Sequence, residues 1–142
     1  MTATTANLLT SGMDRAKLRS YPVLASTTIY DGSIVFIDAT TGYASGDDEA
    51  GANHFVGIAH GAADNSSGAN AAINCEVYSE GNYRHLAFTG TATQATVGVP
   101  VYAVDNQTIQ ASSTNATFIG YCTEYIGAAL VGVDINTKVA AA

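Results

Sequence analysis

From residue 29 onward, short runs of β-branched and aromatic residues alternate with clusters of Gly, Asn, Asp and Ser. Runs of this kind are typical of β-strands that are bounded by turns. Eight such runs imply an all-β domain, which we expect to be a small β-barrel or a compact β-sandwich. The predicted strands cover residues 33–38, 54–60, 72–79, 83–90, 99–105, 108–111, 118–125 and 129–135.

Two of these runs differ in their apolar pattern. In residues 72–79, Ile73, Cys75 and Val77 alternate with more polar neighbours, which indicates a strand with one face in water. Residues 33–37 do not alternate, so we expect them to lie in the core between two layers. The Ser-Glu-Gly-Asn sequence at 79–82 is typical of a tight turn and predicts a hairpin between the third and fourth runs.

The sequence also repeats one pattern of glycine, apolar and aspartate residues. We interpret the repeat as an internal duplication of a strand, a loop and a strand that share one core. The two copies differ by one residue in the spacing to the aspartate and in the length of the loop. The first copy comprises Gly32, Val35, Phe36, Asp38 and residues 55–57, and the second Gly98, Val101, Tyr102, Asp105 and residues 118–120.

The residues before Ser11 show no periodic pattern. Ser11 lies three residues before Asp14, a capping-box-like start that predicts one helical turn from Gly12 to Leu18, which Pro22 then ends. Holding about 20 residues in place costs on the order of 20–40 kcal/mol of backbone entropy. We therefore expect an extended arm that becomes ordered only against another surface.

These features divide the 142-residue chain into three parts. We expect an extended N-terminal arm at 1–28, a β domain at 29–137 and a C-terminal tail at 138–142. The chain has the size of one ordinary domain.

The net charge of −7 is unevenly distributed along the chain. Residues 1–29 hold three basic residues and one acidic residue, whereas the remaining 113 hold eleven acidic and two basic residues. An acidic body repels phosphate backbones, which argues against nucleic acid as a partner, and the basic arm suits an acidic protein surface. The chain also lacks an apolar run long enough for a membrane span, and its first residues lack a secretory signal, so we expect synthesis in the cytoplasm.

Motifs for catalysis are missing from the sequence, which contains no G-x-S-x-G, phosphate-binding loop, H-E-x-x-H or C-x-x-C. We therefore expect no enzymatic activity, no cofactor and no small-molecule substrate. Cys75 and Cys122 each lie within an apolar strand-like run, and we expect both to be buried, reduced thiols.

Two groups of side chains could hold a metal ion. His54 and His60 bracket one predicted strand on the same face, and His85 lies on another, so a zinc site is one interpretation of them. The acidic loop Asp47–Glu49 could bind calcium, but it lacks the alternating oxygen ligands of an EF-hand. Exposed or satisfied histidines and a solvated acidic loop are the favoured interpretations.

Residues 97–135 resemble a family of small tailed-phage proteins, the capsid decoration or cement proteins. The resemblance rests on a G-x-P-V-Y strand, a D-x-x-T-I turn, an [FL]-I-G strand and a closing V-x-V strand. The first copy of the repeat, from Gly32 to Gly57, is similar to the opening half of that family. The matching residues are Gly98, Pro100, Val101, Tyr102, Asp105, Thr108, Ile109, Phe118, Ile119, Gly120, Val131 and Val133.

This resemblance implies a non-enzymatic virion protein that binds the major capsid protein on the outer surface of a phage head, stabilises the head and forms homotrimers. We expect the arm to bind the capsid, with leucines in apolar grooves and cations on carboxylates. A receptor-binding or fibre-tip β module of a phage tail is the alternative, and a small hydrolase is a third class. The expected capsid-binding residues are Leu8, Leu9, Arg15, Lys17, Leu18, Arg19 and Tyr21.

Overall fold

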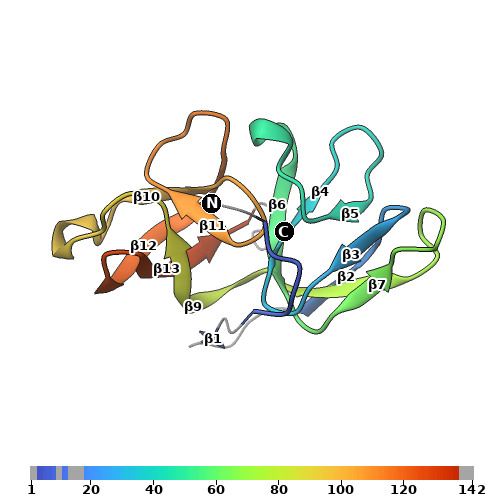
Figure 1. The fold of residues 1–142 in the computed structure, drawn as a ribbon, viewed down its shortest axis with the longest axis horizontal. Coiled ribbons are helices and arrows are strands. Elements are labelled where there is room, and N and C mark those ends of the chain that lie inside the picture. The colour runs from blue at the N-terminus through green and yellow to red at the C-terminus, as the bar shows by residue number, and fades with distance from the viewer. Residues whose placement is uncertain (1–2, 9–10, 13–17, 138–142) are drawn as a thin grey trace.

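The computed structural model describes residues 3–8, 11–12 and 18–137, and over these residues the fold is all-β. The strands gather into two bodies that lie side by side in Figure 1. Strands from the first half of the chain form the body on the right, and strands β9 to β13 form the one on the left.

The second body is a closed ring of strands, here called the second ring. Around the ring the order is β9-β11-β10-β12-β13, and β13 pairs back onto β9. Every pairing is antiparallel except that of β11 with β9, which is parallel. Its strands are β9 (Glu80–Phe88), β10 (Pro100–Ala103), β11 (Thr108–Gln110), β12 (Thr117–Gly127) and β13 (Leu130–Asn136).

The first body, here called the first ring, repeats this topology. Its strands are ordered β2-β8-β6-β4-β5, and a parallel bridge between Val23 and Ala44 joins the end of β2 to β5. When the five strands of each ring are numbered in chain order, strands with the same number therefore occupy the same place in both rings. The strands are β2 (Leu18–Pro22), β4 (Ile34–Ile37), β5 (Ala44–Ser45), β6 (His54–Ala59) and β8 (Asn74–Tyr78).

Short elements complete the fold. β1 (Ser11–Gly12) pairs with β9, and β3 (Thr27–Ile29) pairs with β7 (Ala63–Asn65). Two 3-10 helices, η1 (Glu49–Gly51) and η2 (Gln94–Thr96), lie in loops.

The registers of the two rings confirm the predicted duplication. Val35 pairs with Gly57 and a β-bulge follows; Val101 pairs with Gly120 and a bulge follows at the same place. Both glycines have positive φ, 149° and 155°. A Cβ on Gly57 would meet the backbone of Tyr78, and one on Gly120 would meet the backbone of Asp134. The repeated glycine is therefore needed for the close approach of the next strand.

Each ring encloses apolar residues of its own. The first ring's cluster includes Val35, Val56 and Val77, and the second ring's cluster includes Val101, Ile119 and Val133. Ile34 and Phe36 of β4 belong to the second cluster, so β4 is buried on both faces, as its lack of alternation predicted.

The predicted hairpin at 79–82 is wrong. β8 pairs with β2 and β6, whereas β9 pairs with β1, β11 and β13. Ser79 is 0% exposed, and it carries the chain from one ring into the other. The edges of both strands are taken by partners within their own rings, which leaves no edge for a hairpin. The eight predicted strands themselves are all present.

The arm expected at 1–28 ends earlier than expected. Residues 18–22 pair along their whole length with β8, and Val23 is 0% exposed. Without β2 the first ring would be open, so this segment belongs to the domain. The helical turn predicted from Gly12 to Leu18 is not seen at its ends, since Gly12 lies in β1 and Leu18 in β2. The residues between them, 13–17, lie outside the described part of the chain. The tail expected at 138–142 lies outside it as well.

The start of the chain is also attached to the domain. Thr4 is buried; its N–H donates to Oδ1 of Asn106 at 2.8 Å, and its carbonyl oxygen accepts from Nδ2 of Asn106 at 3.3 Å. The expectation of an arm without contacts on its own domain is therefore wrong for the described part of these residues.

Candidate functional site: a cleft between the rings

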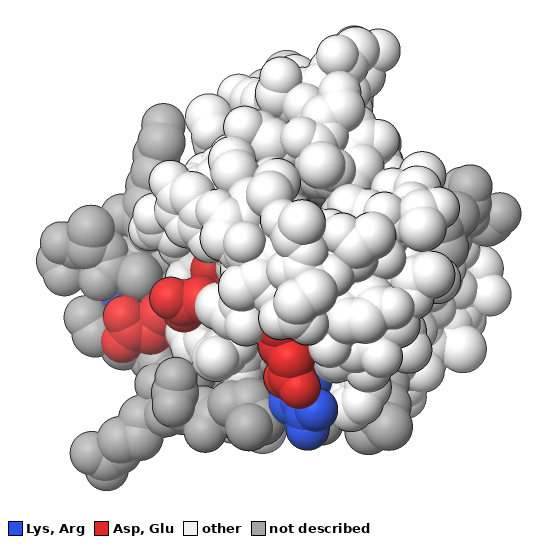
Figure 2. Space-filling model, turned by 90° about the vertical axis from the view of Figure 1, so that its left-hand side faces the viewer, with Lys and Arg blue, Asp and Glu red and all other residues white. Residues whose placement is uncertain are grey.

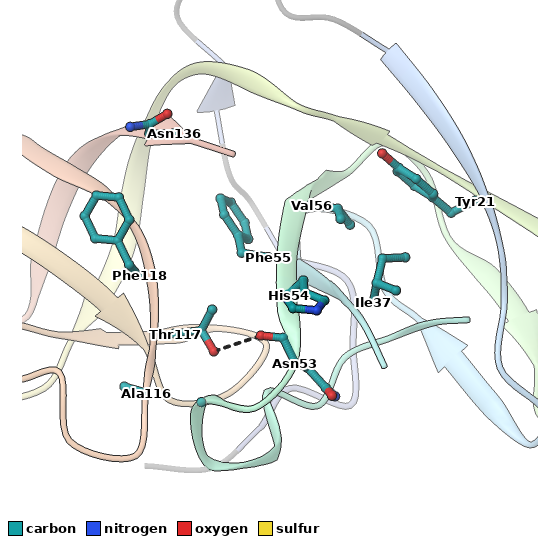
Figure 3. Close-up of a pocket in the computed structure, with 11 residues that line it drawn as sticks. Tyr21, Ile37, Asn53, His54, Phe55, Val56, Ala116, Thr117, Phe118 and Asn136 are labelled. Atoms are coloured by element: carbon teal, nitrogen blue, oxygen red, sulfur yellow. Dashed lines mark hydrogen bonds between the residues drawn. The ribbon is translucent and has the colours of Figure 1, made fainter. Parts of the chain in front are cut away.

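A cleft of about 550 Å³ lies where the first ring faces the start of β12 and the end of β13 (Figure 3). Its floor is apolar and includes Ile37, Phe55 and Phe118, while polar side chains come from both rings. It is lined by Tyr21, Ile37, Gly51, Asn53, His54, Phe55, Val56, Ala116, Thr117, Phe118 and Asn136.

Strand pairing places the side chains of the cleft. Ile37 at the end of β4 pairs with His54 at the start of β6, so both lie at one end of the first ring. Tyr21 approaches the same end from β2, as Figure 3 shows. Phe118 faces them from the second ring, where β12 begins. The cleft therefore combines residues from distant parts of the sequence.

Asn53 holds the wall of the cleft in place. Its Oδ1 accepts from the N–H of Ala39 at 2.9 Å, and its Nδ2 donates to the carbonyl oxygen of Asp47 at 2.8 Å. Its carbonyl oxygen accepts from Oγ1 of Thr117 at 3.5 Å, the bond drawn in Figure 3. Asn53 therefore connects the acidic loop, the turn after β4 and the second ring through hydrogen bonds.

Tyr21 brings a phenol to the cleft. Burial raises its pKa above the ordinary value, and the positive charge of Arg19 opposes that effect only in part. At neutral pH the hydroxyl therefore stays protonated and can donate a hydrogen bond. Together with the imidazole of His54 and the amide of Asn136, it suits the cleft to binding a polar ligand on an apolar surface.

Of the seven residues that the sequence predicted for capsid binding, the structure describes four, and these differ in how exposed they are. Leu8 is half-buried, and its N–H donates to the carbonyl oxygen of Asp31 at 2.7 Å. Leu18 is 48% exposed, whereas Arg19 and Tyr21 are half-buried on the other face of β2. Leu9, Arg15 and Lys17 lie outside the described residues.

The candidate metal ligands do not come together. Among the residues described, no group of three His, Cys, Asp or Glu side chains could hold a metal ion. His54 lies at the cleft, while the ring of His60 contacts that of Tyr78, with 4.8 Å between centroids and a tilt of 48°. His85 lies on β9 in the second ring.

The acidic loop is only partly solvated. Asp47 is exposed and its Oδ1 accepts from the N–H of Glu49 at 2.9 Å, but Asp48 is buried. Burial raises the pKa of Asp48 above its ordinary value, and the negative charge of Asp47 raises it further.

Most of the large exposed apolar side chains lie in the second half of the chain. Of five within the described residues, only Leu18 belongs to the first half of the chain. Figure 2, which views the molecule from the side of the second ring, shows a broad uncharged surface with charged side chains confined to its lower half. The four in the second half are Val97, Tyr121, Tyr125 and Leu130.

Comparisons with protein families, with curated proteins and with solved structures gave no match to this chain. In the part of the chain that the structure describes, helices with the length and hydropathy needed to cross a bilayer are absent.

The sequence singled out Tyr21 as a capsid-binding residue of the arm, not as part of a cleft. Ile37, Phe118 and Asn136 were not predicted as residues of a binding site. The one signal that bears on them is the repeat, because aligning its two copies pairs Ile37 with Ala103 and Phe55 with Phe118.

Proposed function

We propose that this chain is a structural, non-enzymatic virion protein that binds the outer surface of a tailed-phage capsid and stabilises the head. The resemblance of residues 97–135 to capsid decoration proteins suggests this function. The residues that carry it build β10, the turn after it, β12 and β13. They are therefore the framework of the second ring.

The observation that carries the proposal is the uncharged side of the second ring (Figure 2), together with the exposed side chains of Val97, Tyr125 and Leu130. An uncharged surface with exposed aliphatic and aromatic side chains, on a protein that is otherwise acidic, suits the binding of another protein. A capsid offers many equivalent subunits, so repeated weak contacts can hold such a protein firmly.

The N-terminal residues provide a second contact in this proposal. Residues 1–17 precede β2, and they contain two leucines and two basic residues expected to bind the capsid, Leu8, Leu9, Arg15 and Lys17. The exposed Leu18 continues this segment on the surface of the first ring. The partner is the major capsid protein, and the resemblance suggests that homotrimers bind it.

Cosedimentation with phage heads that lack the protein tests this function. We expect the full chain to sediment with expanded heads and the variant without residues 1–17 to bind much more weakly. The truncation stops before β2 because removing residues 18–21 would open the first ring. Circular dichroism shows whether the truncated chain is folded. A full chain that stays in the supernatant at all concentrations would contradict the proposal.

The cleft supports a second candidate, a receptor-binding or fibre-tip module. Sugars are bound by aromatic rings beside amide and hydroxyl groups, and the cleft contains Tyr21, Phe55 and Phe118 beside Asn136. Screening the protein against an array of bacterial glycans tests this function, with Tyr21→Ala as the cleft variant. Antibody labelling of virions separates the candidates, since a decoration protein is labelled over the head and a fibre-tip module only at the tail.

A further inference from the structure

Among the residues that the structure describes, the duplication leaves two surfaces without the contact that their counterparts make. The outward positions of β4 and β6 match those of β10 and β12 residue by residue, because both pairs share one register and one bulge. In the first ring these positions are Ile34, Phe36, Phe55 and Ile58, and in the second ring Pro100, Tyr102, Phe118 and Tyr121.

In the first ring this outward face is covered. Its four residues are 0–6% exposed and form one hydrophobic cluster with the interior of the second ring. The N–H of Ile34 donates to the carbonyl oxygen of Asn106 at 2.8 Å, in the turn after β10. The face therefore closes the end of the second ring at which β10 ends and β12 begins.

In the second ring three of the four residues of the same face are at least partly exposed, while Phe118 borders the cleft of its own chain. Tyr121 is 48% exposed, Pro100 is exposed and Tyr102 is half-exposed. The rings of Tyr102 and Phe118 keep the edge-to-face contact of Phe36 and Phe55, at 5.7 Å and 6.4 Å between centroids. This aromatic face has the same geometry as one that is buried elsewhere in the chain.

The first ring has the complementary opening. The cleft lies at the end of the ring marked by Ile37 and His54, which correspond to Ala103 and Thr117 of the second ring. Ala103 is 0% exposed because its end of the second ring is closed, whereas Ile37 is half-buried and lines the cleft. The cleft is thus the end of the first ring that the second ring of the same chain borders, through Ala116, Thr117 and Phe118, but does not close.

We propose that the aromatic face of the second ring, centred on Tyr102 and Tyr121, binds the cleft of the first ring in a second copy of this chain. The contact repeats between copies the contact that the two rings make within one chain. Such an interface joins unlike surfaces head to tail, and it builds either closed rings or chains of copies. Tyrosines suit it, because they are enriched at protein interfaces and can also face water.

A pair of matched variants tests this interface in sedimentation velocity experiments. Tyr121→Lys places a charge in the aromatic face, next to Asp134 on the paired strand, and His54→Lys places one in the cleft. Tyr125→Lys is the control, since Tyr125 is 38% exposed on the same strand but lies beyond the repeated face. Thermal melting shows that each variant is folded.

We expect the native chain to associate in a concentration-dependent way below about 100 µM, and each of the two interface variants to associate at least about tenfold more weakly. The Tyr125→Lys control associates like the native chain. A mixture of Tyr121→Lys and His54→Lys forms dimers and nothing larger, because one intact face and one intact cleft remain. A native chain that stays monomeric, a Tyr121→Lys variant that associates like it, or a mixture that stays monomeric would each overturn the proposal.

Discussion

Replacing Gly120 by alanine tests the structural basis of the duplication. Gly120 has φ of 155°, and a Cβ there would lie 3.0 Å from the carbonyl carbon of Asp134 and 3.0 Å from the Cα of Ile135. Those atoms belong to the backbone of β13, so they cannot rotate away as a flexible side chain could. The two strands must separate, or the backbone of β12 must change.

The expected loss of stability has two parts. A backbone conformation reserved for glycine costs about 1–3 kcal/mol with another residue, and overpacking costs about 1–3 kcal/mol more. The sum of about 2–6 kcal/mol is a large share of the 5–15 kcal/mol that stabilises a typical domain. With a urea slope of about 2 kcal/mol/M, the unfolding midpoint falls by about 1–3 M.

Urea unfolding followed by circular dichroism measures this loss against three further variants. Gly57→Ala should match Gly120→Ala, because the two glycines are equivalent in the rings. Gly98→Ala, with φ of 90° and no atom within 4 Å, should lose only about 1–2 kcal/mol. Gly127→Ala, also without a neighbour within 4 Å, should be close to native. A loss below about 1 kcal/mol for Gly120→Ala would contradict the claim that the close approach of β13 requires glycine at this position.

Three further predictions concern single side chains. Burial raises the pKa of the Cys75 thiol to about 11 and also raises that of Cys122, so neither should react with a thiol reagent at pH 8 until the protein unfolds; fast labelling of the native protein would contradict this. The raised pKa of Asp48 means that the native state binds its proton more tightly than the unfolded chain, so stability falls as pH rises from 3.8 through the raised value. Asp48→Asn should therefore melt at a higher temperature than the native protein at pH 7 but not at pH 2. A lower melting temperature of the variant at pH 7 would mean that the charged carboxylate stabilises the native state, which contradicts the prediction. Arg84 binds Glu124 through two hydrogen bonds of 2.9 Å and 2.7 Å, but the side chains are 35% and 43% exposed. Glu124→Gln should therefore cost only about 0–1 kcal/mol in urea unfolding, and a loss above 2 kcal/mol would mean that this pair is far less screened by water than its exposure indicates.

Much of the fold was predictable because local patterns determine it. The eight predicted strands follow from their β-branched and aromatic residues, and the repeat around Gly57 and Gly120 correctly indicated a duplication. Four of the five strands that were not predicted have only two or three residues, too few to show a period. The fifth, β2 (Leu18–Pro22), has five residues but ends in a proline, and it was assigned to the arm, so the extent of the first ring was missed.

The cleft could not be predicted, because it depends on how the rings pack. Tyr21, Ile37 and Phe118 come from three distant strands, and each has an ordinary strand pattern around it. The turn at 79–82 shows the same limit. Its residues favour a reversal, but β8 and β9 each find partners within their own ring.

An icosahedral cryo-electron microscopy reconstruction of the virion that carries this chain tests the proposed function most directly. We expect density for paired β-rings at repeated positions over the outer surface of the head, with the second ring or the N-terminal residues against the capsid. Density confined to the tail, or a head surface without such rings, would contradict it.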